Sequence, residues 1–198
     1  MAQVQLSSIS LAFGQRDILR NITFTIGGKD RIALTGANGS GKTTLMKIAA
    51  GISRPDSGVI SREAGTSVSY LPQGGVEYRV GTLLEEAEKG FELQRRLVLE
   101  KDELGQRLGD LREGDPQTDA MLLAFHHLEE RILDSGYYRR EERIEQVLLG
   151  LGFSREDFTK EAAAFSGGWQ MRIALARILL EYSDILLLDE PTNYLDIE

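Results

Sequence analysis

The sequence of 198 residues contains no cysteine and only two histidines, His126 and His127, which are adjacent. The absence of cysteine excludes disulfides and thiolate zinc sites, and two neighbouring histidines argue against a histidine metal cluster. No stretch approaches 18 apolar residues, and the N-terminus MAQVQLSSIS has no basic patch followed by an apolar run. We therefore expect neither a signal peptide nor a membrane-spanning helix.

The residues that are present have the composition of an ordinary globular protein, with 41% hydrophobic and 27% charged residues. The net charge of −8 is unevenly distributed, because residues 85–146 include 17 acidic and 10 basic residues, a net charge of −7. In the same segment the pattern changes from mixed strand and helix to nearly continuous helix. We predict that this segment is an insertion within one domain.

The N-terminal part of the sequence predicts three strands and a helix. Gln3–Ala12 and Asn21–Ile26 are typical of strands, and the turn-rich stretch Gly14–Asp17 lies between them. Arg31–Leu34 predicts a third, short apolar strand, which leads directly into a glycine-rich loop. A helix is predicted after that loop, through Leu45–Ala50.

The glycine-rich loop reads GANGSGKT, from Gly36 to Thr43, and matches the pattern GxxxxGK followed by Ser or Thr. Glycines permit positive φ and let backbone N–H groups approach phosphate oxygens at a helix N-terminus. Lys42 would neutralise charge on the β- and γ-phosphates, and the Thr43 hydroxyl would ligate Mg²⁺. The strand, loop and helix order favours a phosphate-binding loop over a glycine-rich turn that merely starts a helix.

An acidic pair, Asp189 and Glu190, is a second candidate for phosphate chemistry. It directly follows the apolar run Ile185–Leu188, which predicts a strand buried on both faces. In open α/β sheets, chemistry takes place at the carboxyl ends of strands. Asp189 would then bind Mg²⁺ through water, and Glu190 would orient or deprotonate the attacking water. The alternative is an acidic pair that caps the turn before Pro191.

The octapeptide FSGGWQMR, from Phe165 to Arg172, forms another anion-binding edge. Ser166, Gly167 and Gly168 precede a predicted helix, so the Ser166 hydroxyl and the first N–H groups of the helix can bind a phosphate. Two such edges that open separate helices cannot easily reach one nucleotide. We therefore expect a second nucleotide-binding unit placed head to tail, each unit contributing its serine–glycine edge to the other's γ-phosphate.

These motifs resemble those of the ATP-binding cassette superfamily in order and spacing, together with YLPQGG, which contains Gln73, and the ending PTNYLD. Within the superfamily, three features resemble the ABC-F group: Trp169 after SGG, the PTNxLD-type ending, and the long charged helical insert. ABC-F proteins have two cassettes in one polypeptide and no membrane segments, and many act on the ribosome.

The resemblance implies an α/β fold: a P-loop NTPase of ATP-binding cassette type, with an antiparallel β subdomain and a helical subdomain carrying a two-helix hairpin insertion. It implies one cassette over residues 1–198, an inserted helical arm at 82–146, and ATP and Mg²⁺ as cofactors. The implied site residues are Glu190 and Gln73 for catalysis; Phe13 (stacking on adenine), Gly36, Ala37, Asn38, Gly39, Ser40, Gly41, Lys42, Thr43 and Thr44 for the nucleotide; Thr43, Gln73 and Asp189 for the metal; Ser166, Gly167 and Gly168 for contact in trans; and Asp196 in the D-loop.

The sequence departs from the family pattern at three places. Phe165 replaces the usual leucine, and Tyr194 stands where the ABC-F group often has histidine. The chain ends at Glu198, before the family's switch histidine, its strand and the second cassette. We expect the C-terminally truncated first half of a larger protein, with very slow ATP hydrolysis on its own.

The insert predicts two helices, Thr82–Leu111 and Pro116–Asp134, joined by a turn at 114–116. The longer helix would span roughly 45 Å at about 1.5 Å per residue. Charged residues on the outer faces favour a projecting hairpin over a subdomain folded against the core. The net charge of −7 in residues 85–146 would repel the phosphate backbone of RNA. We therefore predict that the hairpin contacts ribosomal RNA only at its tip, through Arg107 and Arg112.

Three functions are compatible with these motifs. The favoured function is that of a cytoplasmic ABC-F ATPase that couples cassette closure to work on the ribosome, with ribosomal RNA and protein as partners. The second is the nucleotide-binding subunit of a membrane transporter. The third is a module that uses ATP as a clamp without hydrolysis, against which Glu190 argues.

Overall fold

The computed structural model of the chain describes residues 3–73, 78–111, 115–181 and 183–190. These residues form two compact, interleaved units. The first, here called the β unit, comprises residues 1–77, 167–174 and 183–198, and the second, the helical unit, comprises 78–166 and 175–182. Among the described residues, no helix is both long enough and apolar enough to span a membrane.

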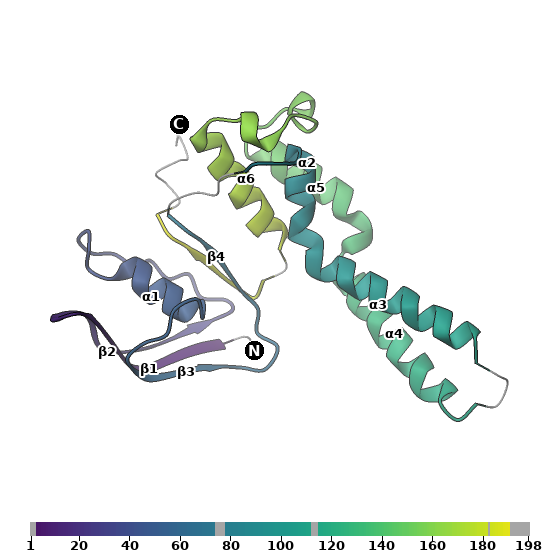
Figure 1. The fold of residues 1–198 in the computed structure, drawn as a ribbon, viewed down its shortest axis with the longest axis horizontal. Helices are drawn as coiled ribbons and strands as arrows, with labels where there is room; N and C mark the ends of the chain where they lie inside the picture. Colours follow the sequence, from purple (N-terminus) through teal and green to yellow (C-terminus); the bar gives the residue numbers. More distant parts are fainter. Residues whose placement is uncertain (1–2, 74–77, 112–114, 182, 191–198) are drawn as a thin grey trace. The chain divides into compact units, whose positions relative to one another are not determined.

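Three strands form an antiparallel sheet in the β unit: β1 (Gln3–Phe13), β2 (Arg16–Gly27) and β3 (Ser57–Arg62), in the order β2-β1-β3 (Figure 1). The first two strands confirm the prediction, but their connection is tighter than predicted. Only Gly14 and Gln15 separate them, so Phe13 pairs directly with Arg16.

One face of this sheet packs against helix α1 (Lys42–Ala49), the helix predicted behind the glycine-rich loop. The inward positions of β1 alternate with exposed polar residues, as expected for a sheet with one solvent face. The buried apolar residues of the cluster are Val4, Leu6, Ile9, Leu11, Leu19, Leu45, Ile48, Ala49 and Ile185. This core fixes the start of α1, and with it the loop, against the sheet.

The other strands of the β unit, β4 (Val68–Leu71) and β5 (Ile185–Leu188), pair in parallel. β5 is the strand predicted before Asp189 and Glu190. The prediction that it is buried on both faces is wrong, because Leu186 is 37% exposed. Within the described residues only one edge of β5 is paired, and the other edge borders a largely apolar cavity of about 630 Å³.

The third predicted strand, Arg31–Leu34, does not form. Ile32 and Leu34 line the same cavity and are 57% and 43% exposed. An extended segment becomes a strand only when its N–H and C=O groups join a ladder. The segment has no such partner among the described residues, and this explains why its apolar sequence predicts a strand that the structure lacks.

The helical unit contains a hairpin of two long helices, α3 (Glu92–Gly109) and α4 (Thr118–Asp134), which lie side by side (Figure 1). Leu97, Leu128 and Ile132 form their shared core. The remaining elements of the unit are α2 (Leu83–Glu88), η1 (Lys89–Phe91), η2 (Tyr137–Arg139), α5 (Arg140–Gly150), η3 (Arg155–Asp157) and η4 (Ala162–Ala164).

The prediction of a single helix over Thr82–Leu111 is wrong, because the 3₁₀ turn η1 separates α2 from α3. At this turn the chain passes close to the C-terminal half of α6 (Gly167–Leu180). A Cβ on Gly90 would lie 2.7 Å from Leu180 Cβ and 2.8 Å from the Arg177 carbonyl oxygen. With 18 residues, α3 is about 27 Å long rather than about 45 Å.

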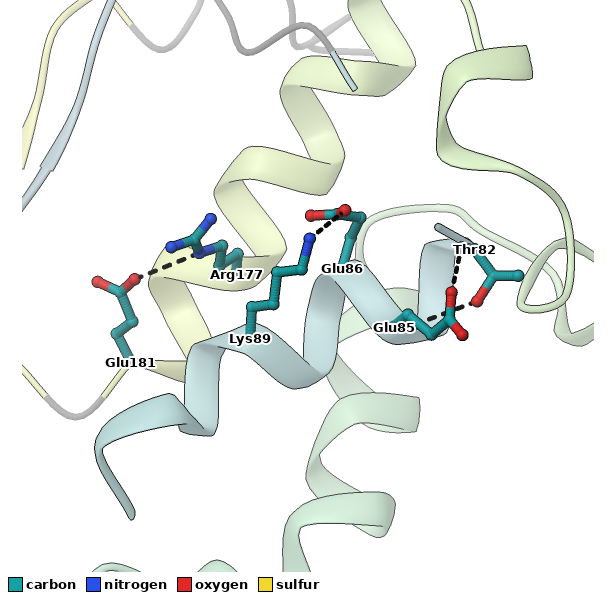
Figure 2. Close-up of polar contacts among 6 residues, drawn as sticks. All are labelled: Thr82, Glu85, Glu86, Lys89, Arg177 and Glu181. Atoms are coloured by element: carbon teal, nitrogen blue, oxygen red, sulfur yellow. Dashed lines mark hydrogen bonds and ion pairs between the residues drawn. The ribbon is translucent and has the colours of Figure 1, made fainter. Parts of the chain in front are cut away.

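A capping box starts α2 (Figure 2). The Thr82 N–H donates to the Glu85 carboxylate at 2.8 Å, and the Glu85 N–H donates to Thr82 Oγ1 at 3.3 Å. Both interactions satisfy N–H groups that a helix start would otherwise leave without partners. The start of α2 is therefore encoded locally, by Thr82 and Glu85.

Polar side chains of α2, η1 and α6 lie near one another (Figure 2). Glu86 is 3% exposed and accepts a hydrogen bond from Lys89 Nζ at 2.5 Å. On α6, Arg177 pairs with Glu181 at 3.6 Å. Burial, reinforced by the nearby Glu86 carboxylate, raises the pKa of Tyr78 to about 12, so this tyrosine stays neutral at physiological pH.

Candidate nucleotide-binding site

The glycine-rich loop takes the backbone conformation that its sequence predicts. Gly39 and Gly41 have φ angles of 77° and 93°, in the left-handed region that glycine adopts without strain. A Cβ on Gly41 would also lie 2.9 Å from Ile18 Cγ2. Helix α1 begins at Lys42 with no side-chain cap. The first N–H groups of the helix are therefore available to an anion.

A cavity of about 470 Å³ adjoins this loop. It brings together residues from the end of β1, the start of β2, the loop, α1, the segment after β4 and the end of β5. The lining residues are Phe13, Arg16, Ile18, Asn38, Gly39, Gly41, Lys42, Thr43, Thr44, Gln73 and Glu190. Phe13 is 64% exposed, so its ring is accessible for stacking.

Lys42 is folded back onto its own loop. Its ammonium group donates to the carbonyl oxygens of Gly36 and Ala37, at 2.9 and 3.1 Å. These two acceptors keep the charge at the mouth of the loop. A phosphate group offers a charged acceptor in place of neutral carbonyls, so it would draw the ammonium group away from them.

Gln73 and Glu190, which we predicted to be catalytic, are in direct contact although they are far apart in the sequence. Gln73 Nε2 donates to the Glu190 carboxylate at 2.6 Å. Glu190 has a φ of 51°, which is unusual for a residue with a side chain. The hydrogen bond fixes the orientation of one Glu190 oxygen at the edge of the cavity.

Asp189 is fully buried, and its two carboxylate oxygens differ in their partners. Tyr70 Oη donates to Oδ2 at 3.1 Å, whereas Oδ1 has no hydrogen-bond partner within the described residues. Burial, reinforced by Asp189, raises the pKa of Tyr70, so the phenol remains a donor. A buried carboxylate oxygen without a partner is suited to a cation or to a water bound to one. Asp189 lines the 630 Å³ cavity and is not among the lining residues of the 470 Å³ cavity, so its Oδ1 offers one oxygen ligand that fits Mg²⁺ beside the nucleotide cavity.

The serine–glycine edge at Phe165–Arg172 opens α6 as predicted, with Ser166 as the N-cap. The Ser166 side chain makes no capping hydrogen bond, and a Cβ on Gly167 or Gly168 would meet nothing within 4 Å. Behind this edge, the Arg172 guanidinium lies 4.5 Å from the centre of the Trp169 ring. Space for an approaching anion therefore exists at these glycines. Asp196 lies outside the described residues.

Sequence reasoning missed two residues near the candidate site. Arg16 lines the cavity, and its position opposite Phe13 could have been inferred from a two-residue hairpin turn. Tyr70 contacts Asp189 because β4 and β5 are adjacent. The sequence signal for Tyr70 was its position in a strand three residues before Gln73, but strand adjacency is a tertiary property.

The family described as ABC transporter matches residues 19–193 of this chain. The chain belongs to the ATP-binding cassette family. It is 34% identical over 201 residues to ABC transporter F family member 2 of Arabidopsis thaliana, covering 98% of this chain and 29% of that protein. It is 31% identical over 197 residues to the uncharacterized ABC transporter ATP-binding protein YfmM of Bacillus subtilis, covering 99% of this chain and 38% of that protein.

Solved structures agree on the fold of the cassette. A structure described as an ABC transporter ATP-binding protein from Pyrococcus furiosus superposes with a TM-score of 0.65 at 19% identity, covering 98% of this chain and 78% of that one. The expected fold class is thereby confirmed: an ATP-binding cassette of P-loop type. The chain spans about a third of the length of the curated relatives that it matches.

Proposed function

We propose that this cassette binds ATP with Mg²⁺ and hydrolyses it, as the first cassette of an ABC-F protein that couples cassette closure to work on the ribosome. The observation that supports ATP chemistry best is the 470 Å³ cavity, which is lined by Lys42, Gln73 and Glu190 together. A phosphate-binding cation, an amide and a carboxylate at one cavity suit phosphoryl transfer to water.

In the proposed bound state, adenine stacks on Phe13, and the phosphates lie against the N–H groups at the start of α1. Lys42 leaves the carbonyl oxygens of Gly36 and Ala37 and pairs with the distal phosphates. Thr43 and Asp189 would hold Mg²⁺, which supplies neutralisation of the phosphate charge when bound. The unpartnered Oδ1 of Asp189 supports its place in this set.

Hydrolysis requires a water aligned with the terminal phosphate. Glu190 accepts a hydrogen bond from that water and receives its proton as the oxygen attacks phosphorus and ADP leaves. Gln73 already holds the Glu190 carboxylate at 2.6 Å, so it restricts the directions in which the carboxylate can point. The Ser166–Gly168 edge serves a nucleotide on a second cassette, and turnover by this chain alone is expected to be very slow.

Two substitutions test the nucleotide chemistry. Lys42→Ala should weaken ATP binding by an order of magnitude or more, measured by titration with a fluorescent ATP analogue. In the full-length protein, Glu190→Gln should retain ATP binding and lose most turnover, because the amide cannot accept the proton. Unchanged affinity in the lysine variant would contradict the binding assignment, and full turnover in the glutamine variant would contradict the catalytic one.

Ribosome association is supported by the relatives that bear the ABC-F name and by the inserted helical segment, which we propose is an arm at residues 82–146. Its net negative charge opposes broad contact with RNA. We propose contact at the tip, through Arg107, which is exposed near the end of α3, and through Arg112, which lies outside the described residues. Replacing both with glutamate in the full-length protein should weaken cosedimentation with ribosomes, whereas neutralising Glu129 and Glu130 should not.

The alternative function is a nucleotide-binding subunit of a membrane transporter, which the description of the matching family favours. The two functions differ in where the full-length protein is found. Fractionation of cells should place an ABC-F protein in the cytoplasm and with ribosomes, and a transporter subunit with membranes. Recovery with membranes in the absence of ribosomes would favour the alternative.

A further inference from the structure

Arg16 lies beside Phe13 at the rim of the nucleotide cavity. The two residues are directly opposite each other in the antiparallel pairing of β1 and β2. Such residues place their side chains on the same face of the sheet, with Cβ atoms about 4.5–5.5 Å apart. Both side chains line the 470 Å³ cavity. Arg16 is therefore adjacent to the space in which a base would stack on Phe13.

The Arg16 guanidinium has no charged partner among the residues that the structure describes. Asp17, its sequence neighbour, pairs with Arg20 at 2.8 Å. No ion pair or side-chain hydrogen bond involves Arg16 within the described part of the chain. The charged residues that line the cavity are Arg16, Lys42 and Glu190, so the lining has an excess of positive charge. Glu190 is in turn held by Gln73.

We propose that Arg16 binds the α-phosphate of the nucleotide. This inference rests on the proposed nucleotide site and adds one residue to it. Phe13 marks the base end of the cavity, and Lys42 with Glu190 marks the end of the terminal phosphate. The anionic group nearest the base end of a nucleoside triphosphate is the α-phosphate. A planar guanidinium with several N–H donors is suited to bind its two free oxygens.

The test compares three ligands: ATP and ADP, which share adenosine and an α-phosphate but differ in the length of the phosphate chain, and inorganic tripolyphosphate, which has a triphosphate chain without a nucleoside. Each is titrated as a competitor of a fluorescent nucleotide. Arg16→Ala should weaken all three by about three- to tenfold, the effect of losing a charge-assisted contact at a partly exposed site. Arg16→Lys should restore part of the loss. Phe13→Ala should weaken ATP and ADP but leave tripolyphosphate unchanged.

Arg20→Ala is the matched control, because it removes an arginine from the same strand whose partner is Asp17. It should leave all three affinities unchanged. Wild-type affinities in Arg16→Ala would overturn the proposal, and so would a loss for ATP and ADP without a loss for tripolyphosphate, which would place Arg16 at the base. Arg16→Gln serves if the alanine variant does not fold. Failure of Lys42→Ala to weaken binding would instead contradict the nucleotide site itself.

Discussion

Gly90 lies where η1 approaches α6 closely, and Gly90→Ala tests that contact. The new methyl group would lie 2.7 Å from Leu180 Cβ and 2.8 Å from the Arg177 carbonyl oxygen. Both distances are below what real Cβ atoms tolerate, and neither neighbour is the end of a flexible side chain. Either η1 or α6 must therefore move to accommodate an alanine.

Two effects of opposite sign determine how much Gly90→Ala changes the free energy of unfolding. Overpacking a close contact typically costs about 1–3 kcal/mol. Replacing glycine by alanine in a helical segment returns up to about 1 kcal/mol. The net expectation is a loss of about 1–2 kcal/mol in the free energy of unfolding, or roughly 2–8 °C in melting temperature for a chain of this length.

Gly109 provides the matched control, because it is the last residue of α3 and a Cβ there would meet nothing within 4 Å. Gly109→Ala should be neutral or slightly stabilising through helix propensity alone. Urea unfolding followed by circular dichroism measures both variants against the parent chain. Equal midpoints for Gly90→Ala and Gly109→Ala would refute the argument that close approach of η1 to α6 requires glycine.

Two further predictions concern single polar contacts. Tyr70→Phe removes the hydrogen bond to Asp189, so turnover of the full-length protein should require a severalfold higher magnesium concentration. The free energy of unfolding should fall by no more than about 1–3 kcal/mol. An unchanged magnesium dependence would argue against a positioning role for Tyr70. Hydrogen bonds from Lys160 and then Ser154 lower the pKa of Asp157 to about 2. The ionised Asp157 therefore stabilises the folded state above the unfolded pKa of about 4, and this stabilisation is lost as the pH falls through the folded pKa. Asp157→Asn should therefore lower the urea midpoint at pH 7 and lower it much less at pH 2, and an equal difference at both values would contradict the pairing.

The features that sequence predicted well are those set by local chemistry. The glycine-rich loop needs positive φ at Gly39 and Gly41 and is followed at once by α1, so a short pattern determines the structure. The same holds for Ser166 as the N-cap of α6. The sequence predicted catalytic roles for Gln73 and Glu190 but not their contact, because no local pattern relates residues that follow separate strands.

The features that sequence predicted poorly depend on distant neighbours. Arg31–Leu34 has an apolar strand pattern, but a strand also requires a paired edge, which the sequence of the segment cannot supply. The break at Lys89–Phe91 lies inside a continuous helical pattern and is associated with the approach of α6 to Gly90. Arg16 was overlooked because its role follows from a hairpin register rather than from a motif.

The open side of β5 has a practical consequence for work with this chain in solution. The apolar side chains of Leu186, Ile32 and Leu34 line one cavity and are accessible to water. Within the described residues, the backbone groups on one edge of β5 form no strand pairing. An unpaired strand edge can form backbone hydrogen bonds with an extended segment of another molecule. Purified 1–198 should therefore self-associate as its concentration rises, and light scattering at increasing concentration would reveal this before any enzymatic assay is interpreted.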